Sequence, residues 1–370
     1  MYYARCVSPE LPEILDCQIF TNVAKLFQCN LRSSAKIKMS ITSIIKKVAL
    51  EIGAIVLVEP EYELVGHITF KNGKKSVFSH SKLDINGFGA ANLVKDKAYS
   101  NFFLKQFGYK VPEGKTFFND NLRAKLTNFR NIDDGFNYAE SMGFPVIVKP
   151  LNLSQGILVT KVYNQAEYYD VADKIFQIKS GLIVEKFYSG NDYRIVVLDN
   201  EVIVAYQRIP LFVVGNGISN VLELLQQKQE KFISLGRKNG IKVDDFRIDK
   251  KLKTQNLHWD SVIPHNQIVY LLDNANLSSG GEAVDFSETI HPDFQKLAIN
   301  ITKDIGLRLA GVDILTHDIT MPMTDYTLIE VNGSPGLDHY AASGKLAAQK
   351  VEELYLKILK ALENDIAVPR

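Results

Sequence analysis

The stretch Thr327–Leu337, TLIEVNGSPGL, is a short apolar run that contains one carboxylate and ends in a Gly-Ser-Pro-Gly turn. The run Leu328–Val331 predicts a buried strand. Glu330 and Asn332 are two residues apart, so in a strand both side chains point to one face. A carboxylate inside an apolar strand is unfavourable unless it is paired or bound to a metal ion. The stretch therefore predicts a buried polar site on a strand.

A second apolar run, Gly311–Leu315, carries Asp313 between aliphatic residues. If the two runs are neighbouring strands, each offers an acidic oxygen ligand to the same place. Magnesium suits such a site, since it takes one or two carboxylates and completes its shell with phosphates and water. The alternative is that Asp313 and Glu330 are ordinary strand residues paired with lysine or arginine. The residues alone leave both interpretations open.

Composition limits the class of protein. A length of 370 residues is enough for two or three packed units. The net charge of +1 gives no reason to expect nucleic acid or an anionic membrane as a partner. No apolar run approaches the roughly 20 residues that span a bilayer. Three cysteines, Cys6, Cys17 and Cys29, and the lack of an apolar signal segment favour reduced thiols in a cytoplasmic protein.

The first 90 residues predict a small α/β unit without recognisable chemistry. Ser40–Leu50 is expected to be helical, and Ile52–Val58 is expected to be a buried strand. His67–Phe70 and Ser76–Phe78 flank Asn72-Gly73, which is a strong hairpin signal.

A helix is expected to open at Val94 and to end near Gly108. It contains Lys97, which by itself is most simply a solvated lysine.

The strand Phe144–Lys149 is followed by a short polar loop and a second strand, Ile157–Val162. A loop of this kind can close its backbone amides around a phosphate, with the lysine supplying positive charge. The loop holds Ser154, Gln155 and Gly156. The alternative is a plain hairpin with a solvated lysine.

The middle of the chain predicts further buried strands. Gly181–Phe187 carries Glu185, and Arg194 and Arg208 occupy later strand positions, where a buried arginine needs an anionic partner. Asn220–Lys231 and Phe246–Leu252 are polar, and we expect them to be irregular.

Taken in order, these motifs resemble the ATP-grasp superfamily of carboxylate–amine ligases, from about residue 84 to residue 370. Within it, the motifs are most similar to the ATP-grasp part of cyanophycin synthetase and of bifunctional glutathione synthetases. The matching stretches are Asp96-Lys97, Val184–Phe187, Gly190–Arg194, Val213–Gly217, Asn276–Gly281, Val284-Asp285, His291-Pro292, Gly306-Leu307, Gly311–Asp313, Glu330–Asn332 and Pro335–Leu337.

The resemblance implies an α/β (α+β) protein with the ATP-grasp fold, in which two α+β subdomains hold the nucleotide between them. We expect a small N-terminal α/β domain at residues 1–90. Residues 91–215 would form the small, lid-bearing subdomain with its preceding helix, and residues 216–370 would form the metal-binding subdomain.

The resemblance also assigns roles to residues. The phosphates of ATP would be met by two lysines and the lid loop, namely Lys97, Lys149, Ser154, Gln155 and Gly156. The adenine edge and the ribose would be met by Glu185, Lys186, Phe187 and Asp192. Two magnesium ions, which manganese can replace, would be held by Asp313, Glu330 and Asn332. Arg208 would stabilise the transferring phosphoryl group, with Arg194 in support. The substrate site would be lined by Ser278, Gly280, Gly281, Ser334 and Gly336.

The implied function is ATP-dependent joining of a carboxylate to an amine through an acyl phosphate, on amino acids or short peptides. Phosphoryl transfer asks the protein mainly for positioning and charge neutralisation, so no covalent nucleophile is needed. No general base for the amine stands out, although His339 follows the metal strand closely. The alternatives are an ATP-grasp small-molecule kinase and a non-catalytic nucleotide-binding subunit of a larger synthetase. The resemblance further implies a homodimer or a homotetramer, with no nucleic-acid or membrane partner.

Overall fold

A five-stranded antiparallel sheet lies at the centre of the computed structural model, which describes residues 40–123, 125, 130–235, 237 and 241–365. Its strands, in spatial order, are β13 (Glu282–Asp285), β10 (Glu201–Ile209), β9 (Asn191–Leu198), β14 (Leu309–Thr316) and β15 (Thr327–Asn332). The predicted strand at Leu328–Val331 is therefore confirmed as part of β15. The three cysteines and the first 39 residues of the expected N-terminal domain lie outside the described residues.

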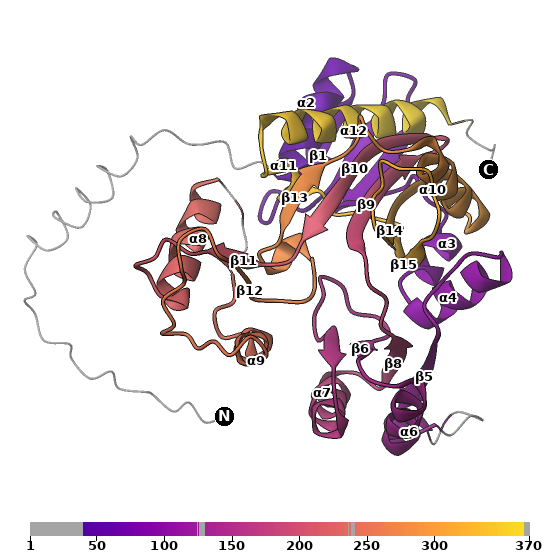
Figure 1. Ribbon diagram of the computed structural model, residues 1–370. Coiled ribbons are helices and arrows are strands. Elements are labelled where there is room, and N and C mark those ends of the chain that lie inside the picture. The colour runs from indigo at the N-terminus through magenta and orange to yellow at the C-terminus, as the bar shows by residue number, and fades with distance from the viewer. Residues whose placement is uncertain (1–39, 124, 126–129, 236, 238–240, 366–370) are drawn as a thin grey trace, which may run out of the picture. The chain divides into compact units, whose positions relative to one another are not determined.

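Helices cover both faces of this sheet, as Figure 1 shows. Tyr193, Ile195 and Val197 of β9 point to one face and pack with α10 (Pro292–Asp304). Val196 and Leu198 alternate with them and pack on the other face with α12 (Lys345–Asn364). Toward the start of β9 this second face carries the polar side chains of Asp192 and Arg194.

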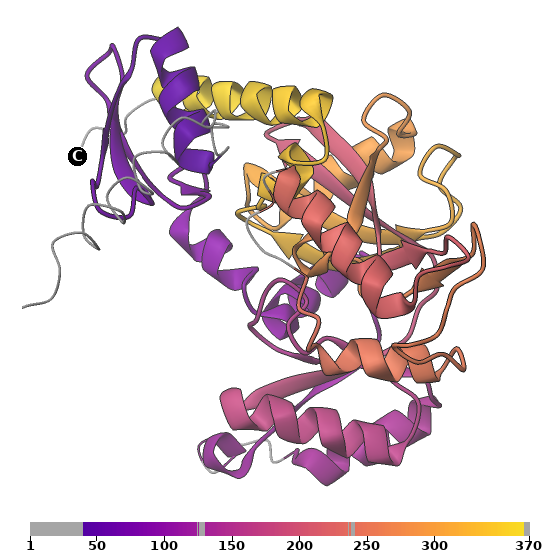
Figure 2. The same cartoon turned by 90° about the vertical axis from the view of Figure 1, so that its left-hand side faces the viewer.

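A smaller antiparallel sheet carries the glycine-containing loop. Its strands, in spatial order, are β5 (Gly114–Phe118), β8 (Gly181–Lys186), β6 (Val146–Pro150) and β7 (Thr160–Val162). One face packs on α6 (Ile132–Met142) and α7 (Gln165–Ile178), which lie side by side in Figure 2. The short helix α5 (Asp120–Arg123) follows β5.

The N-terminal part consists of α2 (Ile41–Glu51) and a four-stranded sheet in the order β1-β2-β3-β4. Its strands are β1 (Ile55–Val58), β2 (Val65–Thr69), β3 (Lys75–Ser79) and β4 (Lys82–Leu83). The predicted hairpin is confirmed, with Gly73 at a φ of +81° in the turn between β2 and β3. α2 packs with α12 in one core.

The helix expected from Val94 to near Gly108 is present but begins three residues later, and a separate short helix precedes it. α3 spans Phe88–Leu93, and α4 spans Lys97–Gln106. Asp96 is the N-cap of α4, and its carboxylate accepts hydrogen bonds from the backbone of Ala98 and Tyr99. This cap places Lys97 in the first turn of α4.

The prediction of irregular structure after residue 220 is wrong. α8 spans Val221–Ser234, and α9 spans Phe246–Lys253. They form a separate core together with β11 (Phe212–Val214) and β12 (Ile268–Tyr270). Both helices still bury an apolar set, Val221, Leu224, Leu225 and Phe232 in α8 and Ile248 and Leu252 in α9, which the polar composition of the segments conceals.

Residues on both sides of 215, the expected boundary between the second and third parts of the chain, contribute strands to the central sheet. No helix among the described residues is both long enough and apolar enough to cross a membrane.

Candidate active site

A row of polar side chains crosses the central sheet, with one residue from each strand. The register places its members directly opposite one another, in the order Asp285, Tyr206, Arg194, Asp313 and Glu330. Directly opposed residues of antiparallel strands project to the same face. Asn332 follows Glu330 by two residues on β15 and pairs with Gly311, which precedes Asp313 by two residues on β14. The side chains of Glu330 and Asn332 therefore project to the same face. The same-face prediction for Glu330 and Asn332 is therefore confirmed.

Two arginines neutralise Asp313, whose side chain is 2% exposed. Arg194 donates from Nε to Oδ1 and from Nη2 to Oδ2, both at 2.6 Å. Arg208 Nη2 lies 3.0 Å from Oδ2. Burial raises the pKa of Asp313, but the two guanidinium groups outweigh it and hold that pKa below its ordinary value. Pairing with arginine, the alternative left open by the sequence, is thus present at Asp313.

Arg208 is held from a second side by Asp192, the residue expected at the ribose. The Asp192 carboxylate accepts from Nε of Arg208 at 2.8 Å and lies 2.7 Å from Nη2. Burial lowers the pKa of Arg208, yet Asp192 and Asp313 reverse this effect and raise it above the ordinary value. Arg208 is therefore a fixed cation between two carboxylates.

Lys97 faces Glu330 from the first turn of α4. Its Nζ lies 3.5 Å from Oε1 of Glu330 and donates to the carbonyl of Leu153 at 2.7 Å. The side chain of Lys97 is 7% exposed, so the solvated-lysine interpretation is wrong. Leu153 belongs to the polar loop, so Lys97 links this loop to β15.

The donor chemistry around Asn332 fits a hard divalent cation. Asp313, Glu330 and Asn332 supply carboxylate and amide oxygens, and Oδ1 of Asp313 accepts only one of the hydrogen bonds described above. The Nδ2 atom of Asn332 is buried without a hydrogen-bond partner, and because it is a donor it calls for an acceptor such as a phosphate oxygen, while the amide oxygen is the atom that can bind a cation. Across the residues that the structure describes, no three His, Cys, Asp or Glu side chains form a metal cluster. The candidate set instead combines two carboxylates with an amide.

Lys149 and Glu185 form a buried ion pair on the small sheet. Lys149 Nζ lies 2.6 Å from Oε2 of Glu185, and the side chains are 5% and 3% exposed. Asn101 of α4 donates to the other oxygen of Glu185 at 3.2 Å. Both residues lie on the sheet face opposite α6 and α7, because they alternate with the strand residues that pack on these helices. Lys149 is therefore not the solvated lysine of a plain hairpin.

Lys161 of β7 was not singled out in the sequence. It lies on the same sheet face as Lys149 and Glu185. Its Nζ lies 3.6 Å from the ring centroid of Phe187, one of the residues expected at the adenine edge. Burial lowers the pKa of Lys161. Lys186 lies at the end of β8, where its side chain is exposed.

The polar loop adopts an unusual backbone conformation. Gln155 and Gly156 have φ angles of +61° and +68°. A Cβ on Gly156 would lie 2.5 Å from side-chain atoms of Asn274 and Asn276, so only glycine fits this close approach. Ser154 closes the loop by accepting a hydrogen bond at its carbonyl from the amide of Ile157.

The expected substrate loop forms a 3-10 turn, η2 (Leu277–Ser279), followed by Gly280 at a φ of +97°. Arg237 holds this loop, because its guanidinium donates to the carbonyls of Leu277 and Gly281. Burial lowers the pKa of Arg237 to about 10. The sequence did not indicate this arginine.

The remaining expected residues lie after β15. Ser334 donates to the carbonyl of Ser81 at 3.1 Å, which ties its loop to the N-terminal sheet. Gly336 is exposed, with open space where a Cβ would stand. His339 lies in α11 (Asp338–Ala341) and is half-buried.

Tyr206, Tyr340 and Lys350 form a polar group with Asp285 at one end of the row, and the sequence analysis did not indicate this group. The rings of Tyr206 and Tyr340 stack with centroids 4.5 Å apart, and the Tyr340 hydroxyl donates a short hydrogen bond to Asp285. Lys350 of α12 lies 3.0 Å from Asp285. Asp285 stood inside a matching stretch of the sequence, but only the sheet register relates it to Arg194.

Two protein-family models match the chain. The model described as D-ala D-ala ligase C-terminus matches residues 103–216, and the RimK-like ATP-grasp domain matches residues 273–354. The first segment carries the small sheet, and the second carries strands β14 and β15. Together with the fold and the site, they define the chain as an ATP-grasp protein.

Within this class, the chain is similar to two kinds of curated protein. It is 33% identical over 267 residues to cyanophycin synthetase of Geminocystis herdmanii, covering 69% of this chain and 29% of that protein. It is 26% identical over 284 residues to the glutathione biosynthesis bifunctional protein GshAB of Listeria innocua, covering 75% of this chain and 36% of that protein. The chain thus spans about a third of the length of these relatives.

The fold is also found in a solved structure. A bifunctional glutathione synthetase from Pasteurella multocida superimposes with a TM-score of 0.55 at 22% identity, covering 86% of this chain and 44% of that one. The expected ATP-grasp fold, with its mixture of helices and antiparallel sheets, is therefore confirmed, as is the resemblance found in the sequence.

Proposed function

We propose that this chain is an ATP-dependent carboxylate–amine ligase that forms an amide or peptide bond through an acyl phosphate, on amino-acid or short-peptide substrates. The observation that carries the proposal is the Arg194–Asp313–Arg208 cluster, with Glu330, Asn332 and Lys97 at its edge. It combines fixed cations with free oxygen ligands on one sheet face. Phosphoryl transfer needs this combination to bind a polyphosphate and neutralise its charge.

The nucleotide would lie between the small sheet and the central sheet. In this proposal, Lys97 and Lys149 contact the phosphates, and the loop with Ser154, Gln155 and Gly156 closes over them. Both lysines are buried and already paired with carboxylates, so they are held in place before a phosphate arrives. The adenine and ribose would be met by Glu185, Lys186, Phe187 and Asp192.

Arg208 would stabilise the transferring phosphoryl group. Asp192 and Asp313 hold its guanidinium in one orientation, so little reorganisation is needed during the reaction. Arg194 would act in support by holding Asp313.

Asp313, Glu330 and Asn332 would hold the magnesium ions, or manganese in their place. The metal would supply positive charge that neutralises the phosphates of the nucleotide. Between them the protein residues supply only oxygen ligands, which is the preference of this cation.

Ser278, Gly280, Gly281, Ser334 and Gly336 would line the substrate site. The carbonyls of Leu277 and Gly281 are anchored by Arg237, which supports a fixed loop shape at this place. No general base for the amine is assigned, although His339 follows β15 by a few residues.

We infer a cytoplasmic protein that acts on small molecules, as a homodimer or homotetramer, without nucleic-acid or membrane partners. The near-neutral charge balance of the chain supports the last point.

The test is ADP release from magnesium-ATP with amino acids and dipeptides, offered singly and in pairs, together with mass spectrometry of the products. A new amide mass that requires a pair supports the ligase. A phosphorylated mass with a single compound would instead establish a kinase. ATP binding without ADP release for any pair would favour the non-catalytic subunit and contradict the proposal.

A further inference from the structure

Arg247 of α9 reaches the lid loop, the segment Leu151–Val159 between β6 and β7. Its Nη1 donates to the carbonyls of Gly156 at 2.7 Å and Val159 at 3.3 Å. These carbonyls are 91 and 88 residues away in the sequence. One guanidinium nitrogen therefore binds two carbonyls near the C-terminal end of the lid loop.

Asp245, the N-cap of α9, orients this arginine. Its Oδ1 accepts from Nε of Arg247 at 2.9 Å, and its Oδ2 accepts from Nη2 at 2.6 Å. Two nitrogens of the fork are thus used by Asp245, and the third points to the lid loop. Because both side chains are 13% exposed, the arrangement is shielded but not deeply buried.

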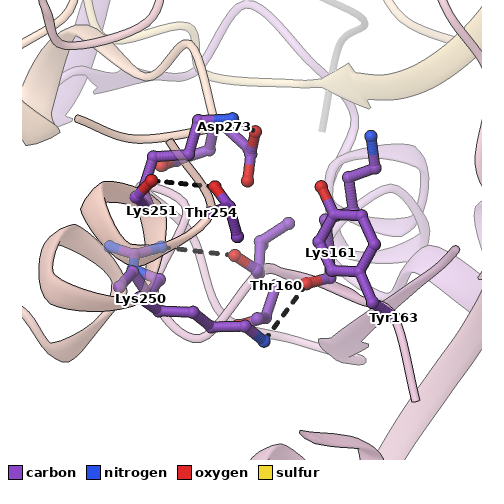
Figure 3. Close-up of a pocket in the computed structure, with 10 residues that line it drawn as sticks. Thr160, Lys161, Tyr163, Lys250, Lys251, Thr254 and Asp273 are labelled. Carbon is purple, nitrogen blue, oxygen red and sulfur yellow. Dashed lines mark hydrogen bonds and ion pairs between the residues drawn. The ribbon is translucent and has the colours of Figure 1, made fainter. Parts of the chain in front are cut away.

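The other contacts between α9 and the small sheet are also polar. Lys250 lies 2.6 Å from Glu167 of α7. Its Nζ also donates to the carbonyl of Lys161 at 3.5 Å, as Figure 3 shows. Lys174 lies 4.0 Å from the ring centroid of Phe246. A small hollow remains between the elements, lined among others by Val159, Lys161, Tyr163, Arg247, Lys250 and Asp273. Partly exposed ion pairs contribute little net stability, so such an interface can open and close.

The lid loop also touches the segment that leads into η2. Gly156 lies so close to Asn274 and Asn276 that a Cβ would be 2.5 Å from their side chains. Asn276 directly precedes Leu277–Ser279. A lid held by Arg247 is therefore in contact with the expected substrate loop.

We propose that Arg247 is a positioning residue that latches the lid loop in its closed form, so that the acyl phosphate reacts with the amine rather than with water. This inference rests on the proposed function. In the unwanted reaction, the oxygen of a water molecule attacks the acyl carbon and the bond from that carbon to the phosphate oxygen breaks. The carboxylate and inorganic phosphate form and a proton is released, so ATP is consumed without an amide product.

The test compares Arg247→Ala with Lys253→Ala in the full chain. Lys253 lies on the same helix, is 65% exposed and pairs with Asp249 of α9, so it is a matched control. The first readout is hydrogen exchange without ligands at the amides of Ile157 and Val159, which bond to carbonyls within the loop. We expect exchange at both amides to accelerate roughly tenfold in Arg247→Ala and to stay unchanged in the control.

The second readout is the number of ADP molecules released per amide formed. We expect a ratio near one for the wild type and the control, and a ratio clearly above one for Arg247→Ala. Arg247→Lys should give an intermediate ratio, because an ammonium group cannot bind Asp245 and both carbonyls in the same fork geometry. Merely structural damage would lower ADP and amide formation in equal proportion.

If the amides of Ile157 and Val159 exchange at the same rate in Arg247→Ala as in the wild type, Arg247 does not latch the lid loop. If Arg247→Ala still releases one ADP per amide formed, Arg247 does not protect the acyl phosphate from water. If Arg247→Ala does not fold, Asp245→Asn tests the same latch, because it removes the carboxylate that orients the guanidinium, and it should shift both readouts in the same direction. Failure of the proposed function is a separate result, because the wild type would then release no ADP with any pair, while the exchange experiment would still decide the latch.

Discussion

Arg194 and Asp313 lie directly opposite each other on β9 and β14, and two guanidinium nitrogens each lie 2.6 Å from a different carboxylate oxygen. The pair is bidentate, and Asp313 has a second cation, Arg208, at 3.0 Å. Each of these charges is compensated by its neighbour, so the cluster is stable only as a set. This mutual dependence makes the cluster the most direct place to test the structure.

Asp313→Asn should destabilise the fold strongly. The change removes one carboxylate from between two buried cations, and breaking a buried pair costs about 3–5 kcal/mol. We expect a loss in this range in the free energy of unfolding measured with urea. Asp325→Asn is the control, because Asp325 pairs with Lys110 where both side chains are largely exposed, and it should behave like the wild type. Equal stability of the two variants would contradict the buried cluster.

Glu330→Gln should abolish turnover without loss of the fold. Its side chain is 27% exposed and its carboxylate has one cation at 3.5 Å, so the amide can be accommodated. The loss of an anionic oxygen ligand should lower ADP release at least about a hundredfold. The comparison is Glu352→Gln, which removes a carboxylate paired with Lys47 on α2. Normal ADP release by Glu330→Gln would refute its role at the metal site.

Lys149→Met should weaken both stability and ATP binding, since it leaves Glu185 buried without its cation. The double variant Lys149→Met, Glu185→Gln removes both charges and should recover much of the lost stability. Its ATP affinity, measured by calorimetry, should remain at least about tenfold weaker than that of the wild type, because a phosphate contact is absent. If ATP affinity recovers together with stability, Lys149 does not contact the nucleotide.

Asp285 should contribute to stability in a pH-dependent way. Burial raises its pKa, but hydrogen bonds from Tyr340, the Ser287 amide and Lys350 outweigh burial and leave the pKa below the ordinary value of 3.8. A lowered pKa in the folded state means that the stabilisation is fully present above about pH 4 and is lost as the pH falls through the folded-state pKa.

Urea unfolding of the wild type and Asp285→Asn from pH 7 to pH 2 measures this contribution. The difference between the two unfolding free energies should be constant above about pH 5 and should shrink below about pH 4. Glu140→Gln, on the exposed face of α6, should follow the wild type throughout. A difference that does not change with pH would mean that the hydrogen bonds to Asp285 do not depend on its charge.

Much of the local structure could be predicted because its signals lie close together in the sequence. The Asn72-Gly73 turn, the helix expected at Ser40–Leu50 and the alternation of β15 each need only a few neighbouring residues. The order of the motifs was also sufficient to identify the ATP-grasp class. Where polar residues dominate, as in α8 and α9, the periodic signal was too weak, and the helices depend on a core that distant segments complete.

The sequence by itself determined which residue types occupy the strands of the site, including the carboxylates of β14 and β15 and the arginines of β9 and β10. Only the tertiary structure decided how they combine. The sheet register pairs Asp313 with Arg194 and sets Asp285 in the same row, and the fold brings Arg247 to the lid loop. Side-chain periodicity records which face a residue takes, but strand register and contacts across 80 or more residues arise from packing of the whole chain, which no local pattern encodes.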